Sequence, residues 1–498
     1  MFVAFIIAYV FILVFIGLIS LGKVKGVSDY FLGGRSINPW MSAFSYGTAY
    51  FSAVLFIGYA GKIGWSFGLS ALWVVAGNTF VGSLLAWYIL GSRTREMTNR
   101  LNASTMPEFI GIRYQSRNLK IVTAIIIFVF LIPYSASVYK GLSYLFEQVF
   151  GIPNHTLLII IASFTAFYLV LGGFVATTIA DFVQGIIMII GVILMVFYVS
   201  SNPIVGSFSK VVSSLNDIDT NLTKPIGPQG FIPTLSLVVL TSLGSWGLPQ
   251  MVHKFYTIRD EKSIVSAKWV STAFALIITF GAYYTGIVSR LFFPESMPTI
   301  NGLPDPDIII PQVLVQTLPD VVLGVILILI LSASMSTLAS LVLASSSAIA
   351  IDLIQGVLYP DIENKRLTQV MRILCSVFVI LSFIIAILPN PIITLASLSW
   401  GAVSGSLLAP YLYGLYWKKT TRMGVWMGII TALVVIIGGA IYTGMDEALM
   451  PIFSATAIVL PLAVIPIVSL ATQGYKEDHL NQIFKTTKVD IISAKSNI

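Results

Sequence analysis

Two stretches within the most apolar parts of the chain carry small and polar residues that could hold a hard cation. The first reads Ser-Ala-Phe-Ser-Tyr-Gly-Thr-Ala-Tyr-Phe-Ser-Ala over residues 42–53, and the second reads Thr-Ser-Leu-Gly-Ser-Trp-Gly-Leu-Pro-Gln over residues 241–250. Glycine and proline lower the stability of a helix, and proline also removes a backbone hydrogen bond. An unwound helix presents free carbonyl oxygens and Ser and Thr add hydroxyls, which are the ligands that hard cations prefer. Both stretches are therefore candidates for helix breaks that line a site.

The chain that must position these stretches is too apolar for a water-soluble protein. Of its 498 residues, 57% are hydrophobic and only 10% are charged. Apolar surface of that extent must face lipid. A hydrocarbon core of about 30 Å takes roughly 20 apolar residues per helix, and the sequence contains about thirteen continuous apolar runs rather than the alternating strands of a barrel. We expect an all-α integral membrane protein that forms one transmembrane domain over residues 1–498.

The apolar runs give the expected boundaries of the helices, and a short tail follows at residues 472–498. The predicted helices cover residues 2–22, 38–60, 65–91, 120–149, 155–174, 180–200, 231–251, 264–293, 313–351, 367–388, 391–417, 423–444 and 449–471.

Basic residues lie almost entirely in alternate loops, which sets the orientation of the chain. Nearly all of the 28 Lys and Arg residues fall in loops on one side and in the tail. The opposite loops hold the acidic residues Glu295, Asp305, Asp307, Asp446 and Glu447. The positive-inside rule then predicts an inner (cell) membrane protein with its amino terminus outside and its carboxyl terminus in the cytoplasm. The net charge of +7 is thereby explained by topology, and we expect the lipid bilayer rather than nucleic acid as the partner.

The two polar stretches lie five predicted helices apart, so they enter the membrane from opposite sides. Unwound backbone at membrane depth is tolerated only where it lines a protein cavity. Discontinuous helices in corresponding positions are typical of an inverted-topology repeat that frames a midplane site. The alternative is that Gly and Ser in these stretches only permit close packing of helices.

Asp181 is a single carboxylate within the predicted membrane depth. Ionisable groups at this depth are costly and mark functional sites. The alternative is structural, because Gln184 follows Asp181 by three residues, which is the spacing of a capping box at the start of a helix. An intramembrane enzyme would need paired carboxylates or a metal cluster facing a cavity, whereas Asp181 stands nearly alone. We therefore do not expect an enzyme.

Four segments in order along the chain resemble motifs of the sodium/solute symporter family, which includes bacterial proline, pantothenate and sialic acid symporters. They are Asp-Tyr-Phe-Leu-Gly-Gly-Arg-Ser at 29–36, Leu-Gly-Gly-Phe-Val-Ala-Thr-Thr-Ile-Ala-Asp-Phe-Val-Gln-Gly at 171–185, Leu-Ser-Ala-Ser-Met-Ser-Thr-Leu-Ala-Ser at 331–340 and Pro-Tyr-Leu-Tyr-Gly-Leu-Tyr-Trp at 410–417. The resemblance implies a leucine-transporter-type core of two five-helix inverted repeats, with one helix before it and two after. The parts would be helix one at 2–22, the repeats at about 38–200 and 231–417, and the last two helices within 423–471.

The same resemblance implies a sodium site between the first broken helix and the ninth. The family's ligands fall on the carbonyls of Thr48, Phe51 and Ala333 and on the hydroxyls of Ser336 and Thr337. The alternative for the two hydroxyls is a hydrogen bond back to their own helix. In some relatives the aligned Asp181 serves a second sodium with hydroxyls of the ninth helix. The matching positions are Ser336, Ala339 and Ser340, of which Ala339 lacks a hydroxyl.

Family position places the solute between the two breaks, beside Ser52, Ala53, Tyr134, Thr241 and Ser245. The family's proline symporters carry a tryptophan at the position of Val54 and bulky aromatics at those of Thr241 and Ser245. Their absence here predicts a wider or more polar cavity than one for proline.

Lys140 lies about 9 Å outward of Tyr134 along one helix, at about 1.5 Å per residue. It could attract a carboxylate, or its side chain could reach the outer interface near Glu147.

The sequence thus predicts a symporter that uses sodium to import a small organic solute, with a carboxylate-bearing amino acid, monocarboxylate or pantothenate-like molecule expected. The alternative is a transporter-derived membrane sensor without net transport, although the tail is too short for a signalling domain.

Overall fold

The computed structural model of the protein describes residues 2–21, 35–300 and 302–484, with the side chains of 18–21, 154 and 164–176 left aside. Most of the motif at 29–36 and the last part of the tail lie outside these residues, as do the side chains at the start of the 171–185 motif. The described chain is almost entirely helical. Its strands are the short antiparallel pair β1 (Thr299–Ile300) and β2 (Leu303–Pro304).

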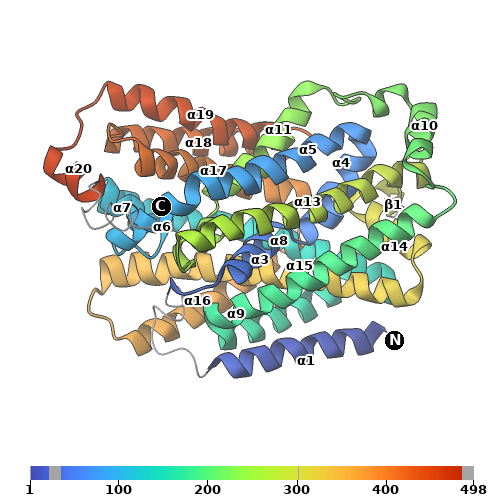
Figure 1. The fold of residues 1–498 in the computed structure, drawn as a ribbon, viewed down its shortest axis with the longest axis horizontal. Coiled ribbons are helices and arrows are strands. Elements are labelled where there is room, and N and C mark those ends of the chain that lie inside the picture. The colour runs from blue at the N-terminus through green and yellow to red at the C-terminus, as the bar shows by residue number, and fades with distance from the viewer. Residues whose placement is uncertain (1, 22–34, 301, 485–498) are drawn as a thin grey trace.

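The long helices run roughly along one axis of the molecule, which lies horizontally in Figure 1. Among the described residues nine helical stretches are long and apolar enough to cross a membrane, or ten when the bent pair at 231–257 counts as one span. Large apolar side chains such as Phe11, Val434 and Ile441 are exposed on the outside of the bundle. A multi-pass membrane protein is confirmed, whereas the count of thirteen stays a prediction.

The first broken helix is built as the sequence predicts. Its inner half is α3 (Pro39–Tyr50), whose N-cap Asn38 accepts a hydrogen bond from the Met41 amide at 2.9 Å. Phe51 and Ser52 leave the helix, and the chain resumes as η2 (Val54–Tyr59) and α4 (Ala60–Phe67). The turn expected near residues 60–65 lies instead at Gly68, whose φ of 60° suits a residue without Cβ.

The second broken helix consists of α11 (Phe231–Ser242), the 3₁₀ turn η7 (Leu243–Gly247) and α12 (Pro249–Thr257). The two arms are bent by 46°. Proline at the first position of α12 is tolerated because the amide at that position has no partner within the helix. The break is confirmed, but the helix ends at Thr257 rather than at 251 as predicted.

Backbone hydrogen bonds join the inner ends of the two broken helices. The Ile37 amide donates to the Thr257 carbonyl at 3.2 Å, and the Arg259 amide donates to the Ile37 carbonyl at 3.1 Å. The Arg95 guanidinium adds a hydrogen bond to the Ile258 carbonyl at 2.9 Å. We call the two backbone bonds the backbone clamp. It ties the start of α3 to the end of α12.

Two predicted boundaries are wrong. The helices expected at 155–174 and 180–200 form one helical element, α9 (Asn154–Ser201). At about 1.5 Å per residue its 48 residues correspond to about 70 Å of helix. The helix expected at 313–351 is divided by Pro319, which follows the extended residue Leu318. It forms α14 (Ile309–Thr317), α15 (Asp320–Ser347) and the π-helix η9 (Ala348–Leu358).

The remaining elements complete the bundle. They are α1 (Phe2–Leu21), η3 (Gly68–Ala71), α5 (Leu72–Ala76), η4 (Gly77–Leu85), η5 (Trp87–Gly91), α6 (Ser92–Arg100), α7 (Met106–Arg113), α8 (Arg117–Phe150), α10 (Phe208–Ile218), η6 (Thr220–Thr223), α13 (Glu261–Phe292), η8 (Pro306–Ile308), α16 (Asn364–Ile387), α17 (Ile392–Tyr416), α18 (Arg422–Thr443), α19 (Met450–Leu470) and α20 (Glu477–Phe484).

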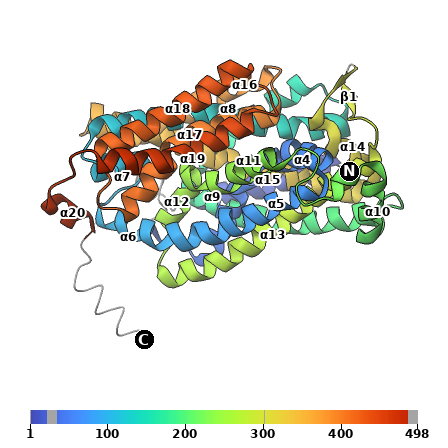
Figure 2. The same ribbon diagram turned by 90° about the horizontal axis from the view of Figure 1, so that it is seen from above.

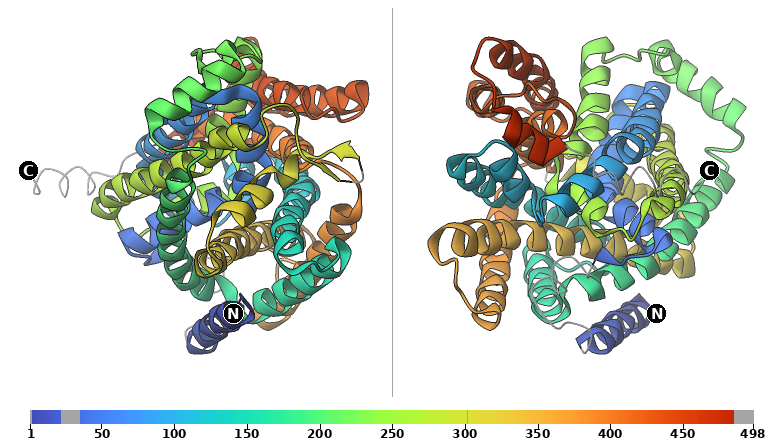
Figure 3. Two further views of the ribbon diagram at one scale, coloured as in Figure 1. Left: turned by 90° about the vertical axis from the view of Figure 1, so that its right-hand side faces the viewer. Right: turned by 60° about the vertical axis from the view of Figure 1, so that its left-hand side comes forward.

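The two ends of the bundle differ in their elements. α6 and α20 lie at one end, whereas α10 and β1 lie at the other, as Figures 1 and 2 both show. α1, α18 and α19 lie at the periphery (Figure 3). α15 and α17 are the most buried spans, since 83% and 94% of their most apolar windows are enclosed. The core that positions the site is therefore made by α15 and α17 with the two broken helices.

Candidate functional site

The end of α3 faces two hydroxyls of α15. Ser336 Oγ donates to the Thr48 carbonyl at 2.9 Å, and Thr337 Oγ1 donates to the same carbonyl at 3.1 Å. Ser336 Oγ also lies 3.2 Å from the Ala333 carbonyl. All four residues are at most 1% exposed. The alternative that both hydroxyls bond only to their own helix is wrong, since both reach across to α3.

This arrangement follows from the break in the first helix. In a continuous helix the Thr48 carbonyl would accept the amide of Ser52, four residues later. The helix ends at Tyr50, so this carbonyl is left for α15. Phe51 is the C-cap residue of α3 and lies at the break itself. Its carbonyl has no described hydrogen bond to Ser336 or Thr337. The structure therefore brings together four of the five predicted sodium ligands, with Phe51 beside them.

The oxygens at this position suit a hard cation. Two carbonyls and two hydroxyls supply four oxygens, and a hydroxyl can turn its proton away to present a lone pair to an ion. Hard cations prefer oxygen ligands, as the better known calcium and magnesium sites show. The residues present thus fit sodium, and they would hold it through Thr48, Ala333, Ser336 and Thr337.

Asp181 lies in the middle of α9, about one helical turn inward of this oxygen cluster. Because α9 begins at Asn154, the capping alternative is wrong, and Gln184 donates instead to the Tyr9 hydroxyl at 2.7 Å. Ser45 of α3 donates a short hydrogen bond to Asp181 Oδ2. Lys254 Nζ lies 3.6 Å from the same oxygen. Asp181 is therefore half of a buried ion pair between α9 and the second broken helix.

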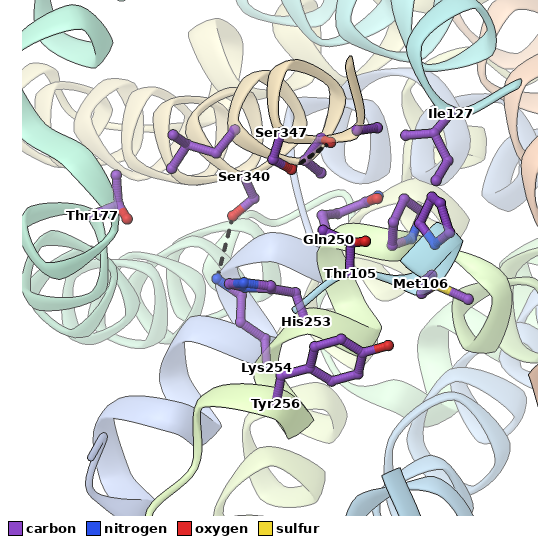
Figure 4. A pocket seen from close by; sticks show the side chains of 15 residues that line it. Thr105, Met106, Ile127, Thr177, Gln250, His253, Lys254, Tyr256, Ser340 and Ser347 are labelled. Atoms are coloured by element: carbon purple, nitrogen blue, oxygen red, sulfur yellow. Dashed lines mark hydrogen bonds between the residues drawn. The ribbon is translucent and has the colours of Figure 1, made fainter. Parts of the chain in front are cut away.

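Lys254 was missed as a site residue because the predicted helix ended at 251, which left the lysine among the loop cations. It lines a cavity together with Ser340. Figure 4 shows the two side chains directed toward each other, and Lys254 Nζ lies 3.4 Å from Ser340 Oγ. His253 and Gln250 of α12 also border this cavity. The predicted residue Ser340 thus faces Lys254.

A second cavity lies between the two helix breaks. Three of the five predicted solute residues line it, namely Ser52, Tyr134 and Thr241. Ala53 and Ser245 do not. The Ser245 hydroxyl donates to the Ser242 carbonyl at 2.8 Å, within its own turn. Among the described residues that line this cavity, none is charged. The full lining is Tyr50, Phe51, Ser52, Val54, Leu55, Tyr59, Asn78, Tyr134, Thr241, Tyr283, Ala396 and Trp400.

The walls of this second cavity, which we call the solute cavity, are largely aromatic. The Tyr134 ring meets Trp400 edge to face, with centroids 5.5 Å apart, and Tyr50 stacks on Phe51 at 4.2 Å. Six aromatic side chains line the cavity, and the expectation that it is wider or more polar than one for proline stays a prediction. Val54, Thr241 and Ser245 lack rings, but other elements supply them. Trp400 and Asn78 were not predicted, although a lone Asn within an apolar run is a usable signal.

Lys140 bonds to the link between two helices rather than to the solute cavity. Its ammonium donates to the carbonyls of Leu388 and Asn390, just beyond the end of α16, and the residue is 7% exposed. It does not line the solute cavity. Cations near the carboxyl end of a helix are favourable because free carbonyls and the helix dipole are negative there. Lys140 therefore stabilises the link between α16 and α17.

Comparisons with known proteins agree with this architecture. The sodium:solute symporter family matches residues 30–471. The sodium/proline symporter of Staphylococcus aureus (strain JH9) is 32% identical over 437 residues, which cover 86% of this chain and 84% of that protein. The substrate-bound outward-open structure of a Na⁺-coupled sialic acid symporter has a TM-score of 0.78 at 17% identity, covering 95% of this chain and 98% of that one. The inward-facing conformation of Mhp1 has a TM-score of 0.50 at 14% identity, covering 91% and 96%.

The two broken helices, the site between them and the structural likeness define the class as membrane transporters with a leucine-transporter-type fold. The predicted fold class is confirmed. The chain belongs to the sodium:solute symporter family. It is a transporter rather than an enzyme, and its general activity is sodium-coupled symport of a solute.

Proposed function

We propose that the protein imports a small carboxylate-bearing solute by alternating access, with sodium bound at Thr48, Ala333, Ser336 and Thr337 beside Phe51. The observation that carries this proposal is the pair of hydroxyls that meet the freed Thr48 carbonyl. Sodium would replace a set of weak neutral hydrogen bonds with ion–oxygen contacts. The ion would thereby fix the end of α3 against α15.

The coupling of ion and solute would run through the first helix break. Thr48 belongs to the oxygen cluster, whereas Ser52, one helical turn later, lines the solute cavity. An ion that orders this turn also shapes the cavity, so sodium and solute each raise the affinity for the other. The proposal thus needs no long-range pathway between the two sites.

The carboxylate would lie at the start of the outer half of the first broken helix. Helical structure resumes at Val54 and runs through Phe67, and helix N-termini attract anions through free amides and the helix dipole. Half-helix ends at the membrane midplane hold anionic groups in transporters. The uncharged aromatic cavity would bury the apolar part of the solute. Amino acids, monocarboxylates and pantothenate-like molecules share this chemistry, and the S. aureus relative makes proline a necessary test solute.

The charges suggest the orientation of the protein in a cell membrane. α6 contains Arg93, Arg95 and Arg100 and lies at the same end of the bundle as α20, whereas α1 begins at the opposite end (Figure 1). The positive-inside rule favours the α6 end as cytoplasmic, with the amino terminus outside. The inner cavity beside Lys254 would then be the path by which sodium and solute leave.

Uptake by proteoliposomes tests the proposal. Purified protein is reconstituted, and radiolabelled amino acids and carboxylates, including proline, are offered under an inward sodium gradient or an equal potassium gradient. We expect one class of solute to accumulate only with sodium and to leak out when a sodium ionophore is added. Uptake driven equally well by a proton gradient would refute sodium coupling. Binding of a solute without any sodium-driven flux would favour the sensor alternative.

A further inference from the structure

The ammonium of Lys254 lies among oxygens that a second cation could use. Its Nζ is 2.8 Å from Ser45 Oγ, 3.4 Å from Ser340 Oγ and 3.6 Å from Asp181 Oδ2. These residues come from α12, α3, α15 and α9, and none is more than 8% exposed. Four elements of the core thus converge on one buried positive charge.

The local chemistry suits an ammonium better than a metal ion. A lysine ammonium has three donors, and oxygens of Ser45, Ser340 and Asp181 lie near it at the distances given. Ser45 accepts from Lys254 and donates to Asp181, so its hydroxyl links the two charged groups. Ala339, one residue before Ser340, offers no side-chain oxygen. While the ammonium occupies this position, these oxygens are not available to a hard metal ion.

The position is close to the proposed sodium site. Ser45 precedes Thr48 by three residues on α3, and Ser340 follows Thr337 by three on α15. At about 1.5 Å per residue, the ammonium lies about one helical turn inward of the oxygens that would hold sodium. One carboxylate, Asp181, serves this region, so it balances one of the two positive charges.

We propose that Lys254 is a built-in cation that takes the place of a second sodium ion beside Asp181, so that a single sodium accompanies each solute molecule. This inference rests on the proposed function, since it refines the ion count of the same transport cycle. The charge balance of a two-ion site is kept with only one mobile ion. Lys254 acts through Asp181 and Ser45 and is therefore a positioning residue that sets stoichiometry.

Equilibrium binding of radioactive sodium alone to the purified full-length protein tests the inference without knowledge of the solute. Wild-type protein is expected to bind one ion with a Hill coefficient of one. In Lys254→Gln the carboxylate of Asp181 loses its internal partner, so a second sodium should bind and the number of ions bound per protein should rise from one toward two. The double variant Lys254→Gln/Asp181→Asn removes both charges and should return to one ion.

Two further variants keep the test informative. Lys254→Arg retains the positive charge and should bind one ion. Lys140→Gln removes another buried lysine that bonds only backbone carbonyls, and it should also bind one ion. If Lys254→Gln does not fold, the wild-type ion count still tests the inference, because two ions bound to wild type would overturn it. Two ions in wild type, or one ion in folded Lys254→Gln, would overturn the inference while leaving sodium coupling intact. Wild-type protein that binds no sodium and shows no sodium-driven uptake would instead overturn the proposed function.

Discussion

The two helix breaks have the same position in their repeats, but their free carbonyls accept hydrogen bonds in different ways. At the first break, two hydroxyls of α15 share the Thr48 carbonyl, and Ser336 has the Ala333 carbonyl as a second acceptor. At the second break, each free carbonyl has its own donor. Tyr50 donates to Thr241, and Ser404 donates to Gly244.

The two breaks differ in the number of hydrogen-bond donors available to each free carbonyl. Either hydroxyl at the first break can turn away without leaving a buried acceptor unpaired, so an ion can enter at low cost. Removal of a donor at the second break leaves a buried carbonyl unsatisfied, which costs about 1–3 kcal/mol. An unwound helix is therefore not by itself an ion site. The first break is arranged to exchange partners, and the second is arranged to hold its shape around the solute cavity.

Removal of both hydroxyls at the first break should have the largest effect. In Ser336→Ala/Thr337→Ala, each lost ligand costs about 1–3 kcal/mol, or roughly five- to hundredfold in sodium affinity. Sodium binding measured without solute should weaken accordingly. Ser334→Ala is the matched control, because the Ser334 hydroxyl bonds to the Ile330 carbonyl of its own helix at 2.7 Å. Unaltered sodium affinity in the double variant would place the ion elsewhere.

An intermediate effect is expected from Trp400, which lines the solute cavity and packs against the second break near Gly244. Trp400→Leu removes apolar wall area, and a loss of about 40–80 Å² of buried contact costs about 1–2 kcal/mol, or roughly five- to thirtyfold in solute KM. Sodium binding without solute should change by less than about twofold, a shift below about 0.4 kcal/mol. Trp73→Leu, at a tryptophan that is 56% exposed, serves as control. If Trp400→Leu weakens sodium binding more than it raises the solute KM, the proposal that the two breaks have separate roles would be wrong.

The smallest effect should come from the second break's own donor. Ser404→Ala removes the hydrogen bond to the Gly244 carbonyl and should lower the free energy of unfolding by about 1–3 kcal/mol. A thermal unfolding assay in detergent should show a lower Tm, with sodium binding retained. Ser266→Ala, at an exposed serine of α13, should leave Tm unchanged. Weakened sodium binding in Ser404→Ala would show that the second break also serves the ion.

Much of the first break could be predicted from the sequence, because Gly and small polar residues inside an apolar run have few other uses. Thr48, Ser336 and Thr337 were placed correctly relative to one another through the family motif. Lys254 was missed for a different reason. The end of a membrane helix is set by tertiary contacts as much as by hydropathy, and α12 continues six residues beyond the predicted end.

The solute cavity was the least predictable region. Its walls come from six separated parts of the chain, and no local pattern shows which faces will meet. Tyr283 and Trp400 look like ordinary apolar residues until α13 and α17 are packed beside the breaks. The absence of rings at Val54, Thr241 and Ser245 therefore does not show how many rings line the cavity as a whole. Asp181 illustrates the same limit, since its capping spacing lies in the interior of α9.

The backbone clamp has a mechanical consequence. Because main-chain atoms make both bonds, the inner arms of the two repeats are joined whatever side chains occupy Ile37, Thr257 and Arg259. α3 and α12 should therefore tilt together as one rigid unit, here called the plate, during the transport cycle. Proline at 37 or 259 would remove a donating amide and break the link, whereas substitutions that keep the amide and fit the buried positions of Ile37 and Thr257 should leave it intact. Slow hydrogen–deuterium exchange of the same two amides would report the plate directly.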